Sequence, residues 1–284
     1  MPSTIDLHIH SANSDGTDTP EELLNKIRLA GIKIFALTDH DTINGAMTLK
    51  NLGVKNFVAG IEFSCITQNN HKCHILGLGY DENNNDFKNA LKAGEDLRHE
   101  KFFKRIKFLN DTFNIKFSDD EIEDLLKIPS VGKPHLGNLI VKKGYAKTRV
   151  EAIENIIDKA KTGNDKISAE LAIKSILSAG GIAIWAHPLG GEREKELPQE
   201  LFLKILAELK NYGLNGLECY YSKYKFTQTE WLDDVAKSEG LLISGGSDYH
   251  GANKHIPLGR LNSDDEIIAP ELLTVLNRLK FERS

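Results

Sequence analysis

Histidines and acidic residues that flank short apolar runs are the groups in this sequence best suited to chemistry. Ten histidines are present, and six of them lie among carboxylates beside such runs. The candidate groups are His8, His10, Asp15, His40, Glu62, His74, His187, Asp248 and His250. Imidazole and carboxylate are ligands of Zn, Mn and Fe(II), and a carboxylate can bridge two ions. Without cations, so many carboxylates would repel one another or have raised pKa values. The pattern therefore predicts a site for several metal ions.

Taken alone, each motif has a simpler explanation. Two histidines spaced i, i+2, such as His8 and His10, are more often surface or core residues than metal ligands. Thr38-Asp39-His40 could be a strand-end turn, and His187-Pro188 could be a buried histidine before a turn. Asp248 and His250 could orient a loop. The metal interpretation is favoured because a barrel would bring all of these groups to one rim.

Short apolar runs rich in β-branched residues indicate the strands that position these groups. The runs are Ile5–Ile9, Ile34–Leu37, Phe57–Ile61, Ile75–Leu78, Ile182–Ala186, Leu214–Glu218 and Leu241–Ser244. Amphipathic helices are predicted between many of them, for example over Pro20–Ala30 and Ala169–Ala179. Strands that alternate with helices indicate an α/β fold, and about seven strands favour a closed barrel. We therefore expect a distorted (β/α)7 barrel.

One connection departs from the alternation of strand and helix. Only the seven residues from Ile66 to Lys72 separate Cys65 from Cys73, which is too short for a helical crossover. The third and fourth strands should therefore form an antiparallel hairpin. This hairpin would place Glu62 and His74 at the same rim of the barrel.

The strand signal disappears between residues 86 and 166, and helical spacing replaces it. The expected helices are Phe87–Leu109, Glu121–Leu126, His135–Lys142 and Arg149–Ala160. We interpret residues 86–166 as a small helical domain inserted into a barrel that residues 1–85 and 167–284 form.

Composition excludes several classes of protein. The 284 residues are 40% hydrophobic and 27% charged, which is typical of a globular chain rather than a disordered one. A net charge of −5 argues against a non-specific nucleic-acid coat. No apolar run approaches the about 20 residues of a membrane span, and the N-terminus does not resemble a signal peptide. Three cysteines without a CxxC pair form no disulfide framework. We expect a cytoplasmic protein without membrane contact.

The motifs resemble those of the PHP (polymerase and histidinol phosphatase) superfamily. The matching segments are Asp6-Leu7-His8-Ile9-His10, Thr38-Asp39-His40-Asp41, Gly60-Ile61-Glu62, Ala186-His187-Pro188 and Ser247-Asp248-Tyr249-His250. The Ser14-Asp15-Gly16 turn and the helical insert are similar to those of nucleoside 3′,5′-bisphosphate phosphatases and related 5′-to-3′ exoribonucleases. The resemblance implies a seven-stranded barrel, an insert that covers the active site, and three divalent ions (Mn, Fe or Zn).

The resemblance also implies how the ligands are shared. His8, His10, Glu62 and Asp248 would hold one ion, Glu62 would bridge to a second held also by His74 and His187, and Asp15, His40 and His250 would hold the third. Asp39 and Asp41 are expected to orient the histidine tautomers. The expected catalytic residues are Asp15, Glu62, His135 and Asp248.

Four residues are expected to bind substrate: Lys133, His135, Tyr221 and Arg260. Gly132-Lys133-Pro134-His135 resembles the subgroup's Gly-Arg-Pro-His, which reaches towards the substrate phosphate, although lysine lacks the bidentate fork of arginine. Helix capping is the alternative for His135, aromatic packing for Tyr221, and a structural ion pair for Arg260.

The resemblance implies that a hydroxide held between ions removes the 3′-phosphate of a nucleoside 3′,5′-bisphosphate. The main alternative is a 5′-to-3′ exonuclease acting on short RNA or DNA. That activity would need a basic groove, for which Lys101, Lys104, Arg105 and Lys107 are candidates. A histidinol-phosphate phosphatase and an inert metal-binding module are weaker alternatives. The expected partner is a small nucleotide or a short oligonucleotide, and the sequence does not indicate an oligomeric state.

Overall fold

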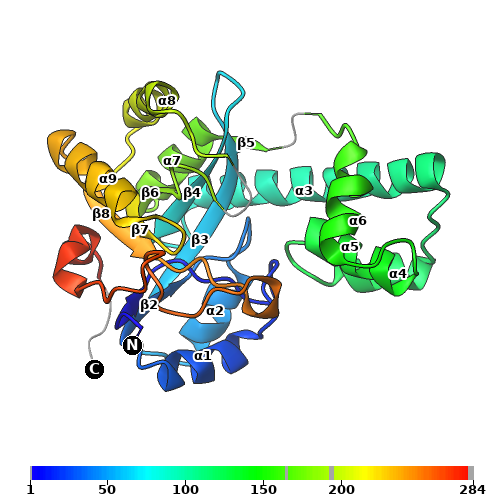
Figure 1. Ribbon diagram of the computed structural model, residues 1–284, viewed down its shortest axis with the longest axis horizontal. Coiled ribbons are helices and arrows are strands. Elements are labelled where there is room, and N and C mark those ends of the chain that lie inside the picture. The colour runs from blue at the N-terminus through cyan, green and yellow to red at the C-terminus, as the bar shows by residue number, and fades with distance from the viewer. Residues whose placement is uncertain (1, 164–165, 192–194, 281–284) are drawn as a thin grey trace.

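A mixed β-sheet rolled into a nearly closed barrel forms the centre of the molecule (Figure 1). The computed structural model describes residues 2–163, 166–191 and 195–280. The strands are β1 (Ile5–Asp6), β2 (Ile34–Leu37), β3 (Phe57–Ile66), β4 (Lys72–Leu78), β5 (Ile167–Ser168), β6 (Ile182–Ala186), β7 (Gly216–Tyr221) and β8 (Leu242–Gly246). Their order around the barrel is β1-β2-β3-β4-β6-β7-β8, and the short β5 pairs with β3 outside this path. The predicted α/β barrel is confirmed.

Backbone hydrogen bonds close the barrel by joining β8 and the residues after it to the residues that follow β1. The Leu7 N–H donates to the Gly245 carbonyl at 3.1 Å, and the Asp248 N–H donates to the His8 carbonyl at 2.8 Å. β1 is shorter than the predicted Ile5–Ile9, although the backbone after it still bonds to the segment after β8. The buried Asp6 carboxylate accepts the N–H groups of Ser247 and Gly259 and so holds this segment in place.

The predicted hairpin is confirmed, since β3 and β4 are antiparallel neighbours. Ser64 pairs with His74 in their register. β4 also pairs antiparallel with β6, so it runs against both of its neighbours. Glu62 and His74 therefore lie at the same rim, as the short connection required.

Helices cover the outside of the sheet (Figure 1). They are α1 (Pro20–Leu29), α2 (Asn44–Asn51), α7 (Ala169–Ser178), α8 (Gln199–Asn211) and α9 (Phe226–Ser238). Sequence signals set their ends: the Thr19 side chain accepts the Glu22 N–H at the start of α1, and Ser168 accepts the Leu171 N–H at the start of α7. No helix in the described part of the chain is long and apolar enough to cross a membrane.

The helical insert consists of α3 (Asn85–Phe113), α4 (Asp119–Leu126), α5 (Lys133–Lys142), α6 (Arg149–Asn155) and a 3-10 turn (Ile157–Lys159). Figure 1 shows α3 reaching out from the barrel, with the other insert helices packed at its far end. The first part of α3 contributes Phe87 and Ala90 to the barrel core. A separate apolar cluster begins at Phe102. The two cores thus meet within α3.

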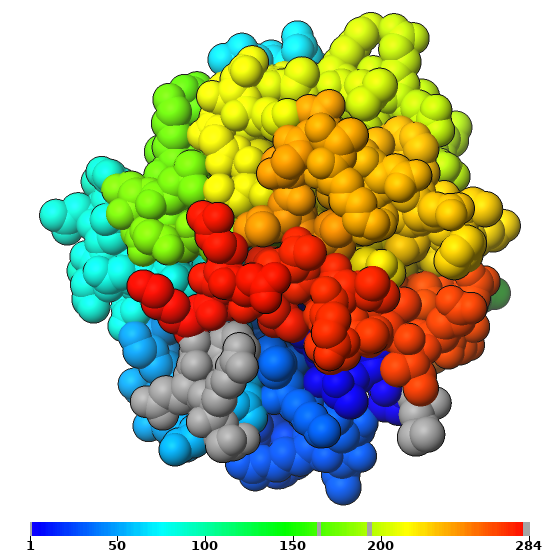
Figure 2. Space-filling model, turned by 90° about the vertical axis from the view of Figure 1, so that its left-hand side faces the viewer, coloured from blue at the N-terminus to red at the C-terminus, as the bar shows by residue number. Residues whose placement is uncertain are grey.

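The C-terminal segment lies across the molecule between the N-terminal segment and the β7–β8 side (Figure 2). The Ser3 N–H donates to the Gly259 carbonyl at 2.9 Å, and the Ile243 N–H donates to Thr274 Oγ1 at 2.9 Å. These bonds hold both chain ends against the closing strands of the barrel.

Candidate metal centre

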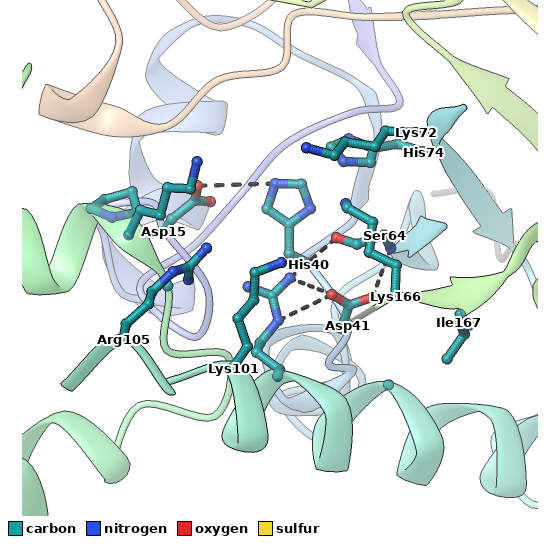
Figure 3. Close-up of a pocket in the computed structure, with 15 residues that line it drawn as sticks. Asp15, His40, Asp41, Ser64, Lys72, His74, Lys101, Arg105, Lys166 and Ile167 are labelled. Atoms are coloured by element: carbon teal, nitrogen blue, oxygen red, sulfur yellow. Dashed lines mark hydrogen bonds and ion pairs between the residues drawn. The ribbon is translucent and has the colours of Figure 1, made fainter. Parts of the chain in front are cut away.

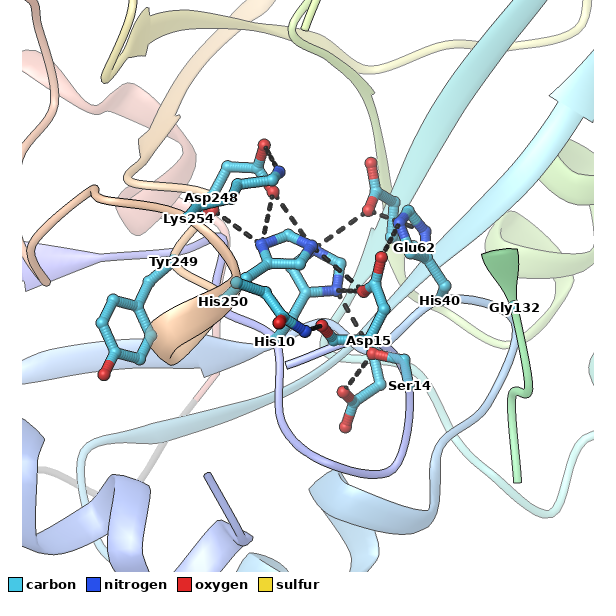
Figure 4. Close-up of polar contacts among 12 residues, drawn as sticks. His10, Ser14, Asp15, His40, Glu62, Gly132, Asp248, Tyr249, His250 and Lys254 are labelled. Carbon is cyan, nitrogen blue, oxygen red and sulfur yellow. Dashed lines mark hydrogen bonds and ion pairs between the residues drawn. The ribbon is translucent and has the colours of Figure 1, made fainter. Parts of the chain in front are cut away.

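All nine side chains that the sequence predicted as metal ligands lie together at one end of the barrel. Figure 4 shows six of them, which are His10, Asp15, His40, Glu62, Asp248 and His250. His8 and His10 follow β1, Asp15 precedes α1, His40 follows β2, Glu62 and His74 lie in β3 and β4, His187 follows β6, and Asp248 and His250 follow β8. The strands thus bring together groups as far apart along the chain as His8 and His250.

The buried carboxylate of Glu62 is the centre of this arrangement. Its Oε1 lies 2.9 Å from His74 Nδ1 and 3.1 Å from His187 Nε2. Its Oε2 lies 3.1 Å from His10 Nε2 and 3.0 Å from His40 Nδ1. A carboxylate with two oxygens that face different histidines has the geometry of a bridging ligand.

A second cluster, the loop group, consists of His10, Asp15, His40 and His250. Asp15 Oδ1 lies 3.1 Å from His250 Nε2, and Asp15 Oδ2 lies 4.0 Å from His40 Nε2. The rings of His10 and His250 stack with centroids 4.0 Å apart. Potential ligand atoms of all four residues lie within 4.8 Å of one another.

The three predicted ligand sets are each brought together, although their members overlap. His10 belongs both to the loop group and to a group with His8 and Glu62. Asp248 Oδ1 lies 3.6 Å from His8 Nε2 and 3.4 Å from His10 Nε2. The assignment of each residue to one ion stays a prediction.

The nitrogen and oxygen atoms of the site are arranged to bind divalent cations rather than to form hydrogen bonds with one another. Asp15 Oδ1, His40 Nδ1 and Glu62 Oε2 are buried without a hydrogen-bond partner in the described structure. His40 Nδ1 and Glu62 Oε2 nevertheless lie only 3.0 Å apart, so these atoms are close but not aligned to bond. Buried polar atoms that face one point without bonding are the expected surroundings of a cation.

Burial and charge divide the histidines into two kinds. Burial lowers the pKa of His74 and of His250 to about 4, so both imidazoles are neutral near pH 7. Burial also lowers the pKa of His10, but the nearby carboxylates of Asp248 and Glu62 raise it to about 9. Burial alone would raise the pKa of Glu62, yet the surrounding imidazoles, His40 first, hold it well below its usual value. Cations would replace the protons that this carboxylate-rich site attracts.

Glu218, which the sequence did not predict as a site residue, holds two of the ligands. Its Oε1 lies 2.9 Å from His8 Nδ1, and its Oε2 accepts the His187 backbone N–H at 2.7 Å. Glu218 is completely buried. It turns His8 Nε2 towards Glu62, which is the orienting role of a carboxylate behind a metal-bound histidine. The sequence did offer one signal for Glu218, because this acidic residue ends the predicted strand Leu214–Glu218.

Asp248 is held by two further side chains. Lys254 Nζ lies 2.6 Å from its Oδ2, and the Tyr221 hydroxyl donates to the same oxygen at 2.9 Å. Lys254 was not predicted. The Tyr221 ring is fully buried, which agrees with the alternative of packing at the rim; its role as a substrate residue stays a prediction.

Asp39 and Asp41 do not contact the histidines in the way we expected. Asp39 accepts bonds from the Ser11 N–H at 2.7 Å and from Ser14 Oγ at 2.6 Å, and it reaches His10 only through Ser14. Asp41 forms an ion pair with Arg98 of α3 and accepts the Ser64 N–H at 2.7 Å. Both carboxylates therefore fix loops rather than imidazole rings.

The backbone has an unusual conformation at three positions in the site. Asp41, His187 and Asp248 have positive φ angles of 49°, 30° and 57°. Non-glycine residues adopt this region rarely, and such strain concentrates at functional sites. The surrounding hydrogen bonds hold these residues in place.

The remaining predicted substrate residues differ in their surroundings. His135 Nδ1 accepts the Gly132 N–H at 2.9 Å, as the capping alternative expected, and its ring is close enough to Asp15 for that charge to act on its pKa. Lys133 lines the pocket beside the site and pairs with Asp158. Arg260 pairs with Asp265 at 2.8 Å, which agrees with the alternative of a structural ion pair, and its role as a substrate residue stays a prediction.

A pocket of about 310 Å³ adjoins the predicted ligands (Figure 3). Its walls include Asp15, His40 and His74 on one side and α3 and the start of α5 on the other. Six cationic residues line it: Lys72, Arg98, Lys101, Arg105, Lys133 and Lys166. We call this the cationic pocket. Lys104 and Lys107, which the sequence grouped with Lys101, pair instead with Glu100 and Asp111 on the exposed face of α3.

Comparisons with known proteins agree with the geometry. The PHP domain family matches residues 6–165. The 5′-3′ exoribonuclease of Haemophilus influenzae is 30% identical over 94% of this chain and 98% of its own. The 3′,5′-nucleoside bisphosphate phosphatase of Chromobacterium violaceum is 26% identical over 87% of each chain. A solved structure from Bifidobacterium adolescentis, classed as a metal-dependent phosphoesterase, superposes with a TM-score of 0.79 at 25% identity, over 99% of this chain and 98% of that one.

The family match ends before His187, Asp248 and His250, yet the fold places these three residues beside the matched ones. The site therefore combines residues inside the matched range 6–165 with residues from the later strands of the barrel. The chain belongs to the PHP family and is a metal-dependent phosphoesterase.

Proposed function

We propose that the protein removes the 3′-phosphate from a nucleoside 3′,5′-bisphosphate. The cationic pocket is the observation that carries this proposal, because it offers a second phosphate a place directly beside His40 and His74. Six cationic side chains line this pocket, so a second phosphate bound there would meet a strongly positive potential. The name of the C. violaceum relative agrees with this substrate class.

The nine predicted ligands would hold divalent ions, which supply an activated water and neutralise charge that develops on the phosphoryl oxygens. The protein's own groups set the geometry. Glu218 orients His8, and Lys254 with Tyr221 occupies one oxygen of Asp248 so that the other faces the histidines. Burial lowers the pKa of His135 below its usual value, so we assign its neutral ring to hydrogen bonding with a phosphoryl oxygen.

The cationic side chains of the pocket differ in their ion pairs and in their burial. Arg98 is engaged by Asp41, and Lys133 is engaged by Asp158. Lys166 is partly buried, and this burial lowers its pKa although the Asp41 charge raises it. A buried ammonium gains most when a phosphate arrives, because its interaction with an anion is weakly screened. We therefore choose Lys166 for the test.

The test compares 3′-phosphoadenosine 5′-phosphate with adenosine 3′-monophosphate in the presence of Mn²⁺. We expect a higher kcat/KM for the bisphosphate. Lys166→Met should lower that value by about 10- to 100-fold, mainly through KM, because a charge-assisted bond is lost. Lys104→Met, on the exposed face of α3, is the control. Equal kcat/KM for both substrates, or no phosphate release with Mn, Fe or Zn while other phosphoesters are cleaved, would reject the bisphosphate.

A 5′-to-3′ exonuclease is the second candidate, because Lys101 and Arg105 extend the cationic lining along α3. The H. influenzae relative bears that name. A 5′-phosphorylated RNA oligonucleotide separates the two activities. Mononucleotides released stepwise from its 5′ end would favour the exonuclease, and an uncleaved oligonucleotide would favour the phosphatase.

A further inference from the structure

The helical insert is attached to the rim of the barrel through three loops, and each loop carries a member of the loop group. Arg98 of α3 binds Asp41, the residue after His40. The Ser130 N–H donates to the Asn13 carbonyl at 3.0 Å, in the loop that holds Asp15. Arg149 of α6 binds Asn253, in the loop that begins at His250.

The contact between Arg149 and Asn253 joins two of these loops. Arg149 donates to the side-chain oxygen of Asn253 and, at 2.8 Å, to its backbone carbonyl. Asn253 Nδ2 in turn donates to the Asp15 carbonyl at 2.6 Å. The Ala252 N–H donates to Thr17 Oγ1 at 2.9 Å, which packs the same two loops together. One asparagine therefore connects the insert to the backbone of Asp15.

The other predicted ligands depend on the barrel instead. Glu62 and His74 lie within the paired strands β3 and β4. His8 and Asp248 are joined by the backbone bond that closes the barrel. Their positions are thus set by the sheet, and a backbone bridge to Glu62 ties His40 to it as well. Asp15 and His250 instead stand on loops that need support from outside the sheet.

We propose that the insert positions the loop group, chiefly through Arg149 and Asn253, so that ion binding at this group and docking of the insert stabilise each other. Such coupling is reciprocal: whatever the docked insert adds to ion affinity, the bound ion adds to docking. This role goes beyond the proposed function and holds for whichever phosphoester is cleaved.

The first experiment measures Mn²⁺ binding by calorimetry and by metal analysis after equilibrium dialysis, without substrate. Arg149→Met should weaken one class of Mn²⁺ site about tenfold or more, and Arg149→Lys should restore part of the loss. Lys143→Met is the matched control, because Lys143 pairs with Glu121 inside the insert. In a His250→Asn background, Arg149→Met should have no further effect, since both changes act on the same ion.

The second experiment needs no variant. Amide hydrogen exchange of α5 and α6 in the wild-type protein should slow when Mn²⁺ is added. Unchanged exchange at saturating Mn²⁺ would overturn the proposal. So would an Arg149→Met protein that exchanges faster in α6 yet binds every Mn²⁺ with wild-type affinity, because the insert would then be held to the rim without positioning a ligand.

Discussion

Replacing Glu218 with glutamine tests the site through a residue that does not itself face the predicted ions. Both of its oxygens act as acceptors, one for the His8 ring and one for the His187 N–H. Glutamine has the same shape but offers only one acceptor. The amide must therefore fail at one of the two contacts.

Each orientation of the amide has a cost that the structure defines. If its NH₂ group faces the His187 N–H, two buried donors oppose each other, at a cost of about 1–3 kcal/mol. If it faces His8 Nδ1, that nitrogen must accept, and the proton moves to Nε2, the atom that faces Glu62 at 3.3 Å. His8 then loses the lone pair it needs as a ligand. Either outcome should weaken metal binding about 10- to 100-fold.

The assay is Mn²⁺ titration of Glu218→Gln and of wild type by calorimetry, with circular dichroism as the check on folding. Glu230→Gln, on the exposed face of α9, is the control for the loss of one negative charge. A folded Glu218→Gln protein with Mn²⁺ affinity within about twofold of wild type, against the tenfold minimum expected, would refute the orienting role of Glu218.

Three further predictions concern stability. Burial raises the pKa of Asp41, but the charges of Arg98 and His40 together with the bonds from Ser64 and Arg98 outweigh it and hold the pKa below its usual value. The stabilisation from this carboxylate is therefore present above about pH 4 and is lost as pH falls further. In urea unfolding of the EDTA-treated protein, the stability difference between wild type and Asp41→Asn should therefore shrink below that pH, and a constant difference would contradict it. Gly246→Ala should destabilise by about 1–3 kcal/mol, because its Cβ would lie 2.3 Å from His8 Cβ; Gly94→Ala, whose Cβ would have ordinary contacts, serves as the comparison in the same unfolding experiment. Mn²⁺ at about 100 times its Kd should add about 2.7 kcal/mol of stability over EDTA, and equal melting temperatures in the two conditions would show that no ion binds the folded state.

The sequence predicted much of the site because its ligands lie at the ends of apolar runs. Parallel strands in a barrel end at the same rim, so a residue that follows a predicted strand in sequence can be placed at that rim. The antiparallel hairpin could be predicted for a different reason: the connection between Cys65 and Cys73 is too short for anything else. Capping residues such as Thr19 and Ser168 set helix starts through local bonds.

The residues that support the ligands could not be found in the same way. Glu218 ends a predicted strand, but its partners His8 and His187 are distant in sequence, so its orienting role is not visible there. Nothing in the neighbours of Lys254 indicates its contact with Asp248. The ion pair between Arg98 and Asp41 depends on how the insert lies against the barrel, which no local periodicity encodes. A rim position in sequence also does not show where a side chain points: the Tyr221 ring is buried, and Arg260 pairs with Asp265.

The continuity of α3 has a consequence for how the protein folds and how it can be shortened. Phe87 packs against Phe63 and stacks on Tyr80, with ring centroids 5.9 Å and 4.2 Å apart, so the first turns of this helix complete the barrel's own apolar interior. Excision at residue 86 would remove that aromatic side chain, a loss of about 3–5 kcal/mol when a phenylalanine is truncated in a core. A minimal barrel would have to keep α3 to a point before Phe102. As long as α3 is continuous, this rod-like helix should make the barrel and the insert melt in a single transition.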